Sequence, residues 1–383
     1  MFHPTIHRCI FWVHLVTGIA AGLVILMLAV SGLLMSFETQ IVDGLERSIV
    51  REKFNDDITP LTVAEMIAAF EKADIQGSPS SLSYSSVANT PTLFLVNRGE
   101  RHLFHPTTGE SLGKGAVKTR QFFKSVLSIH RWLTFSSEPS RSWKDIGGQI
   151  TGGGALGFLF LLISGLIIWI PKKLRWNAFK AVLTIHPRLK GRARDWNWHN
   201  VIGIWASPFI LTLCLTGIIM SYPWANRLLF QSFGETPPLR KMQTGQRGAP
   251  ARKPIAHHRL DALAEFAKQK VPAWQNIVME LPTTPDQPLV VTIADAGRGR
   301  PDRREKFTLD PVSLAILKHE TFADMKPGQR ARQIVRWLHT GELGGWPGQL
   351  LALLTCSAVI VLLGTGFTLS IRRFFQKQKP TTA

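Results

Sequence analysis

The 383-residue sequence predicts an α-helical membrane protein, in which four transmembrane helices form two pseudo-twofold repeats and two small α+β modules lie outside the membrane. Four apolar segments hold no Asp, Glu, Lys or Arg, and each is longer than the roughly 20 residues that span a bilayer. Two of them, residues 11–37 and 197–222, share one pattern, in which a histidine is followed by glycine four and eighteen residues later.

The four segments divide the chain into a regular series of parts. We expect each module to end in an amphipathic helix, rich in aromatic residues, that lies at the membrane interface. The parts are the first tail and span (1–37), a module with its interfacial helix (38–146), a span (147–170), a basic loop (171–196), a span (197–222), a second module with its interfacial helix (223–349), a span (350–371) and the last tail (372–383).

Periodicity within the modules predicts one helix and a few strands in each. In the first module the predicted helix covers residues 61–73 and the strands cover 81–96 and 101–112. In the second module the predicted helix covers residues 260–270 and the strands cover 278–281, 288–294 and 305–317.

The formal net charge of +19 is explained by topology. The short loop 171–196 and the two ends of the chain together hold a net charge of +12. Basic excess in short loops marks the cytoplasmic side of a membrane. We therefore expect a bacterial inner-membrane protein with cytoplasmic termini and periplasmic modules, whose basic residues face lipid headgroups rather than nucleic acid.

The first repeated pattern suggests a shared ligand between two helices. Residues four and eighteen apart lie on one face of a helix, so His14, Gly18 and Gly32 form one stripe. His199, Gly203 and Gly217 form the equivalent stripe. Glycine leaves space beside an imidazole, and two facing histidines could ligate one b-type haem. The alternative is that small residues only let the helices approach closely and that the histidines bond across helices.

A second pair of histidines lies in the predicted interfacial helices. His130 and His339 occupy similar positions in the two halves, and each has an arginine nearby, Arg131 and Arg336. If the repeats pair these histidines as they pair the first two, a second haem would lie towards the Gly32 and Gly217 ends of the stripes, with the arginines at its propionates. The alternative is that both are ordinary residues of an amphipathic helix.

The remaining motifs restrict the chemistry. The three cysteines, Cys9, Cys214 and Cys356, form no haem-attachment or metal-binding signature, so any haem would be non-covalent. The sequence has no nucleotide-binding fingerprint in a suitable context. Electrons would then come from a membrane quinol or from a cytoplasmic reductase, and the sequence does not decide between them.

The chain as a whole resembles the PepSY-associated transmembrane family. The resemblance is carried by the four spans, the repeated His-x-x-x-Gly, the segments 130–133 and 222–224, and most specifically by residues 338–350. One departure is His105, which stands where Asp310 keeps the family's Asp-Pro in the second module.

The family includes iron-regulated inner-membrane proteins and ferric-siderophore reductases, so the resemblance implies an oxidoreductase. It implies two haem b groups with His14, His199, His130 and His339 as ligands, and a ferric siderophore as the substrate. Three alternatives stay open: a non-redox component of siderophore binding or import, a PepSY-type periplasmic regulator, and a quinol-linked cytochrome with another acceptor.

Overall fold

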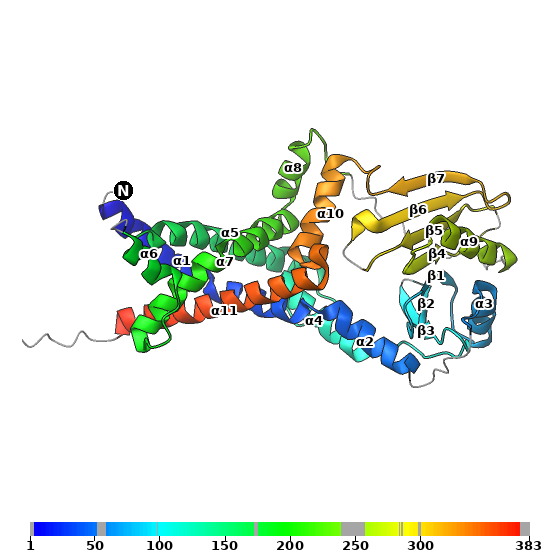
Figure 1. Cartoon of the computed structure of the whole chain (residues 1–383), viewed down its shortest axis with the longest axis horizontal. Coiled ribbons are helices and arrows are strands. Elements are labelled where there is room, and N and C mark those ends of the chain that lie inside the picture. Colours follow the sequence, from blue (N-terminus) through cyan, green and yellow to red (C-terminus); the bar gives the residue numbers. More distant parts are fainter. Residues whose placement is uncertain are drawn as a thin grey trace, which may run out of the picture. The chain divides into compact units, whose positions relative to one another are not determined.

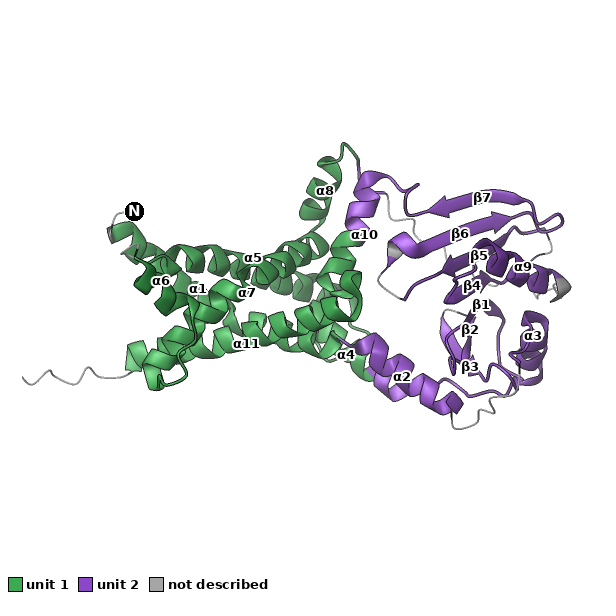
Figure 2. Ribbon diagram, viewed as in Figure 1, with its two compact units in different colours: residues 1–36, 122–235, 334–383 green, residues 37–121, 236–333 purple. Residues whose placement is uncertain are grey.

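The computed structural model describes residues 4–51, 59–97, 99–171, 175–238, 257–282, 284, 286–297 and 300–375. The chain forms two compact units, coloured separately in Figure 2. Unit 1 comprises residues 1–36, 122–235 and 334–383, and unit 2 comprises residues 37–121 and 236–333.

Unit 1 is a bundle of four long helices that are long and apolar enough to cross a membrane (Figure 1). Each helix contacts two others: α1 and α7 each lie against both α5 and α11. The chain is therefore a membrane protein with four spanning helices, as predicted. Their bounds are α1 Pro4–Met35, α5 Arg141–Trp169, α7 Gly191–Ser221 and α11 Gly345–Phe375.

All four helices begin before the apolar segments do, and α1 begins at Pro4. Helix α5 starts at Arg141 because the Ser140 hydroxyl caps it, accepting a hydrogen bond from the Trp143 backbone N–H at 3.2 Å. Helices α7 and α11 both start at a glycine in the left-handed region, Gly191 (φ 55°) and Gly345 (φ 62°). Polar residues therefore continue each helix outside the membrane core.

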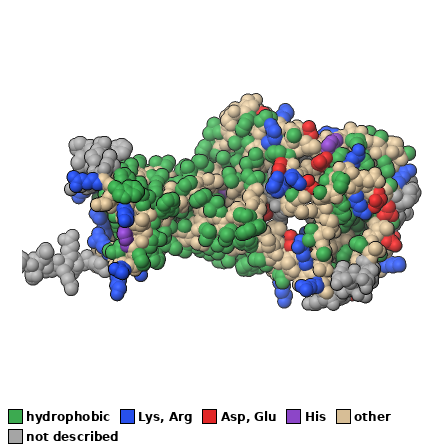
Figure 3. All heavy atoms as spheres, in the orientation of Figure 1, with side chains coloured by type: hydrophobic (Ala, Val, Ile, Leu, Met, Phe, Trp, Pro, Cys, Tyr) green, Lys and Arg blue, Asp and Glu red, His purple; other side chains and the backbone are tan. Residues whose placement is uncertain are grey.

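The bundle has an aliphatic centre and an apolar surface. Ile25, Leu161, Ile210 and Val359, one from each long helix, are buried together at its core. Large side chains on the outside stay exposed, with Leu23 at 67 % as an example. Figure 3 shows hydrophobic side chains along the bundle and Lys and Arg side chains at the end where α1 begins. This surface suits a lipid environment.

Shorter helices flank the long ones. Helix α4 (Val117–Trp132) carries His130 in its last turn, and α10 (Pro327–His339) ends on His339. The parts of α4 and α10 that hold these histidines belong to unit 1. The other short helices of unit 1 are α6 Trp176–Leu183, α8 Pro223–Gln231 and the 3-10 turn Glu342–Gly344. Helix α2 Glu38–Arg51 and the 3-10 turn Pro301–Arg303 belong to unit 2.

Unit 2 contains one antiparallel sheet of seven strands in the order β3-β2-β1-β4-β5-β6-β7. Strands β1 and β4 pair through Ser83 and Val278, so the two soluble regions share a sheet. The predicted strand over residues 305–317 is wrong in extent: Asp310 accepts hydrogen bonds from the Val312 and Ser313 N–H groups and turns the chain into a seventh strand. The strands are β1 Pro79–Ser85, β2 Thr92–Val96, β3 Glu100–Phe104, β4 Asn276–Glu280, β5 Leu289–Ala294, β6 Arg304–Leu309 and β7 Ile316–Thr321.

Two helices cover one face of this sheet. Helix α3 (Val63–Lys72) and helix α9 (His257–Lys270) contact each other, and their apolar residues share a single buried core with the strands. Helix α3 begins at a capping box, in which Thr62 and Glu65 each bond the other's backbone N–H, a favourable way to satisfy free N–H groups at a helix start. Unit 2 is thus a stable α+β body with its own core.

Candidate functional site

The structure brings His130 and His339 together. Their ring centroids lie 6.2 Å apart, and the ring planes make an angle of 62°. Helices α4 and α10 hold the two rings against the bundle, where the His130 Nδ1 lies 2.9 Å from Ser31 Oγ of α1. The His339 Nδ1 lies 2.8 Å from Thr216 Oγ1 of α7. We call His130 and His339 the second histidine pair.

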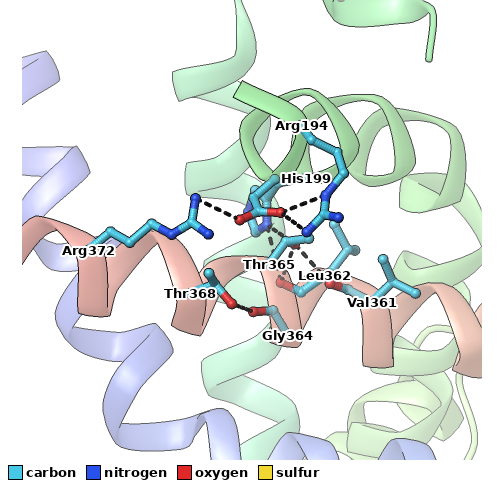
Figure 4. Close-up of polar contacts among 9 residues, drawn as sticks. Arg194, His199, Val361, Leu362, Gly364, Thr365, Thr368 and Arg372 are labelled. Atoms are coloured by element: carbon cyan, nitrogen blue, oxygen red, sulfur yellow. Dashed lines mark hydrogen bonds and ion pairs between the residues drawn. The ribbon is translucent and has the colours of Figure 1, made fainter. Parts of the chain in front are cut away.

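His14 and His199, the first histidine pair, line one pocket inside the bundle. The pocket encloses about 660 Å³, including space that opens to the outside, and Gly165 and Gly203 also line it. The His14 Nδ1 lies 2.8 Å from Ser164 Oγ of α5. The His199 Nδ1 lies 3.0 Å from Thr365 Oγ1 of α11 and 3.1 Å from the Leu362 carbonyl oxygen (Figure 4). All four histidines therefore contact a hydroxyl of another helix through the same ring atom.

The acceptors around each ring determine which ring nitrogen carries the proton. Besides the hydroxyl they include a backbone carbonyl of the same long helix, as Leu362 is for His199. Each hydroxyl also lies against the carbonyl four residues before it in its own helix: Ser31 Oγ is 2.5 Å from the Met27 oxygen and Thr216 Oγ1 is 2.6 Å from the Thr212 oxygen. A hydroxyl has one proton to donate, and the carbonyl accepts it, so the hydroxyl accepts from the histidine. Nδ1 is then the protonated nitrogen. The same contacts are made by Ser164 to Phe160 (2.7 Å) and by Thr365 to Val361 (2.8 Å).

The other ring nitrogen, Nε2, is available in all four histidines. Within the part of the chain that the structure describes, Nδ1 makes every hydrogen bond of these four rings. Burial, followed by the nearby His339 ring, lowers the pKa of His130 to about 4. Burial also lowers the pKa of His339 to about 4. Both rings of the second pair are therefore neutral near pH 7, which is the form that ligates a metal.

A glycine lies under each histidine ring. A Cβ added to Gly165 would be 3.3 Å from His14 Cε1, and one added to Gly366 would be 3.4 Å from His199 Cε1. Gly32 and Gly217 have the same relation to His130 (3.7 Å) and His339 (3.4 Å). Because these glycines lack a side chain, the rings can approach the helix backbone closely.

The other two predicted glycines contact leucines. A Cβ on Gly18 would be 3.7 Å from Leu161 Cδ2, and one on Gly203 would be 3.6 Å from Leu362 Cδ2. Gly203 lines the pocket of the first pair, whereas Gly18 is outside its lining. The glycines of each predicted stripe therefore do not all lie beside the first pair. Gly32 and Gly217 lie under His130 and His339 instead.

The two predicted arginines stack on tryptophans. The Arg131 guanidinium lies 4.6 Å from the Trp132 ring centroid, and that of Arg336 lies 5.1 Å from the Trp337 ring centroid. Both arginines are exposed at the level of the second pair. The structure thus places them beside the candidate ligands as fixed positive charges.

A buried carboxylate lies near the first pair. Asp195, one helical turn before His199 in α7, is 3 % exposed. Its Oδ1 accepts from Arg194 Nε at 3.1 Å and Nη2 at 2.9 Å, and its Oδ2 lies 3.3 Å from Arg372 Nη1 of α11. Figure 4 shows both arginines converging beside His199. Asp195 therefore links α7 to α11 and gathers two cations at this end of the bundle.

The distance between the rings of the second pair is close to the distance expected for two imidazoles on one metal. A metal about 2 Å from each nitrogen, with each ring centroid about 1 Å beyond its nitrogen, separates the centroids by about 6 Å. The observed separation is 6.2 Å. Among the described residues no group of three or more His, Cys, Asp or Glu side chains could hold a bare metal ion. Two imidazoles suit a metal whose other ligands come from a macrocycle, as in haem.

Sequence reasoning missed the hydroxyls and two of the glycines. Together with the predicted Gly32 and Gly217, the missed residues form a dipeptide in each long helix: Ser31-Gly32, Ser164-Gly165, Thr216-Gly217 and Thr365-Gly366. The hydroxyl bonds Nδ1 and the following glycine admits the ring. Every span holds a Ser/Thr-Gly pair, and this recurrence is the signal that could have found them. Two spans hold a second pair, Thr17-Gly18 in α1 and Thr151-Gly152 in α5.

Comparisons with known proteins agree with this architecture. Comparison with curated proteins finds no match. The family described as the PepSY-associated TM region matches residues 11–373, which is nearly the whole chain. The chain therefore belongs to the PepSY-associated transmembrane family.

Proposed function

We propose that this protein is an inner-membrane di-haem b-type cytochrome that reduces ferric siderophores in the periplasm and releases the iron as Fe(II). The observation that carries the proposal is the second histidine pair, whose rings are 6.2 Å apart with unprotonated Nε2 atoms. Each pair would hold one non-covalent haem b through Nε2. When bound, such a haem supplies a one-electron redox centre.

The chain's own residues orient and shield these centres. The hydroxyls of Ser31, Ser164, Thr216 and Thr365 hold the rings through Nδ1. The aliphatic core around Ile25, Ile210 and Val359 excludes water between the long helices. Arg131 and Arg336 are suited to bind carboxylates at the second pair, because a guanidinium donates paired hydrogen bonds to a carboxylate.

The proposed topology follows from charge. Lys and Arg side chains gather at the end of the bundle where α1 begins (Figure 3), which supports a cytoplasmic position for that end and for both termini. The first histidine pair then lies on the cytoplasmic side and the second on the periplasmic side. The two halves, each with a His pair member on a span and one on a short helix, are proposed to be pseudo-twofold repeats.

The substrate is proposed from family resemblance and chemistry. A siderophore holds Fe(III) far more tightly than Fe(II), so adding one electron loosens the complex and frees the metal. The electron would come from a membrane quinol or a cytoplasmic reductase. His14 and His199 would hold the haem nearer that donor, and His130 and His339 would hold the haem nearer the siderophore. No acid, base or nucleophile is required for this reaction.

The test uses purified full-length protein in detergent. We expect a low-spin haem spectrum, and we expect anaerobic, dithionite-reduced protein to be reoxidised by ferric siderophores with formation of Fe(II). His319→Ala is the matched control for the variants His14→Ala and His339→Ala, because His319 is an exposed residue of unit 2. Colourless protein would favour a siderophore-binding or regulatory role. A haem spectrum without reoxidation would favour a quinol-linked cytochrome with another acceptor.

A further inference from the structure

The contact between histidine and hydroxyl is built in the same way at four places. Ser31, Ser164, Thr216 and Thr365 each lie on a different long helix, are buried, and contact one histidine of another helix at 2.8 to 3.0 Å. Each hydroxyl is also held by a carbonyl of its own helix. Its proton is therefore directed to that carbonyl, and its oxygen accepts from the ring.

The arrangement also fixes the plane of each ring. A ring that donates from Nδ1 and whose Cε1 lies over a glycine is held at two adjacent atoms. At the second pair, Ser31 and Gly32 hold His130, while Thr216 and Gly217 hold His339. The result is the 62° angle between the two planes. The angle therefore depends on two hydroxyls from two helices.

We propose that Ser31, Ser164, Thr216 and Thr365 are positioning residues that hold the ring plane of the haem-ligating histidines and accept from their Nδ1–H, and that they thereby set the redox potential of each haem. This inference rests on the proposed function. When a histidine ligates through Nε2, an acceptor that takes a hydrogen bond from its Nδ1–H raises the basicity of the ligand. A more basic ligand stabilises the ferric state, so each hydroxyl lowers the potential of its own haem.

The four residues divide between the two sites. Ser164 and Thr365 contact the first pair, and Ser31 and Thr216 contact the second. Removing one hydroxyl should therefore raise the potential of one haem and leave the other unchanged. A general loosening of the bundle would instead disturb both haems.

The experiment is a spectroelectrochemical titration of the full-length protein, with electron paramagnetic resonance of the ferric form. The variants are Ser31→Ala and Ser164→Ala, each paired with the conservative Ser→Thr change that restores a hydroxyl. Ser207→Ala is the matched control, because the Ser207 hydroxyl donates only to its own helix, to the Ile204 carbonyl at 2.7 Å. Ser207 is also a buried residue of a long helix.

We expect Ser31→Ala to shift one potential upward and Ser164→Ala to shift the other. We expect both threonine variants and Ser207→Ala to match the unaltered protein. Ser31→Ala should also change the g values of the second haem, because its ring can then rotate. Loss of one haem in an alanine variant, with retention in its threonine partner, would equally support the positioning role.

The inference is overturned if both alanine variants keep unaltered potentials and g values. It is also overturned if each alanine variant shifts both haems together, or if the threonine variants behave as the alanine variants do. These results would leave the haem assignment intact, since haem would be present throughout. Absence of haem from the unaltered protein would instead reject the proposed function, and the inference with it.

Discussion

The rings of His130 and His339 lie 6.2 Å apart, close to the separation of two imidazoles on one metal. They come from helices α4 and α10, which are almost 200 residues apart in the chain, and each ring is anchored to a different long helix. The closeness of the two rings therefore depends on the packing of four helices, α1, α4, α7 and α10. The predictions below follow from this relationship and from its counterpart at His14 and His199.

Replacing one histidine of a pair should remove one haem. We expect His339→Ala to halve the haem content per chain, and His14→Ala to halve it through the other site, because a single axial ligand holds a non-covalent haem weakly. The double variant should be colourless. Haem content per chain, measured as the pyridine adduct, checks this, and His319→Ala should keep the full content. Unchanged haem in His339→Ala would remove His339 from the ligand set.

A side chain at Gly165 should displace the His14 ring. An added Cβ would already lie 3.3 Å from His14 Cε1, and the larger valine overfills the space at a cost of about 1–3 kcal/mol. We expect Gly165→Val to lose the haem of the first pair and to keep that of the second. Gly153→Val is the control, since a Cβ at Gly153, in the same helix, meets no described atom within 4 Å. Equal haem loss in both variants would contradict the prediction.

Asp195 should stabilise the bundle by joining α7 to α11. Asp195→Asn leaves Arg194 and Arg372 without their carboxylate. Because Arg194 is half exposed, solvent screens part of the loss, and we expect a decrease of about 1–2 kcal/mol in the free energy of unfolding. A lower thermal midpoint of unfolding in detergent would report this decrease in stability. Glu320→Gln, which breaks the exposed pair with Lys318, should have almost no effect, and an equal effect of both changes would contradict this role.

The sheet should fold as one body across the two soluble regions. Val278 of β4 is paired on both sides, with Ser83 of β1 and Thr292 of β5. Proline there removes a ladder hydrogen bond from a central strand, where proline is essentially not found. We expect Val278→Pro to increase amide hydrogen exchange in strands of both regions.

The control for this prediction is proline at an edge. Leu317 lies in edge strand β7, at a bulge in its pairing with β6, and edge strands tolerate proline. Leu317→Pro should therefore leave the exchange of β1 and β2 unchanged. If Val278→Pro affected only residues 276–321, the two regions would be independent domains.

The sequence predicted the four spans and drew attention to the four histidines, because apolar length and a repeated His-x-x-x-Gly spacing are local patterns. The position of Gly32 eighteen residues after His14 can be read from helical geometry alone. The bond between His14 and Ser164 cannot, because it depends on how α1 and α5 are rotated about their axes. The sequence did place Gly32 at the end of its stripe that is nearer the second pair, and Gly32 lies under His130, but the stripe alone could not show this contact.

The sheet illustrates the same limit. Alternation predicts strands such as Leu289–Ala294, but the pairing of β1 with β4 joins segments about 190 residues apart, and nothing local specifies it. Apolar residues on both sides of Asp310 made residues 305–317 read as one strand and concealed the turn there. That turn forms because the carboxylate binds two backbone N–H groups, which is typical of aspartate in turns.

The most direct test of the central claim is the haem content and spin state of the purified full-length protein. Two haem b per chain, both low-spin and six-coordinate, would match two bis-histidine sites at the His14–His199 and His130–His339 pairs. Protein without haem, or protein whose haem is high-spin with an open axial position, would contradict the account.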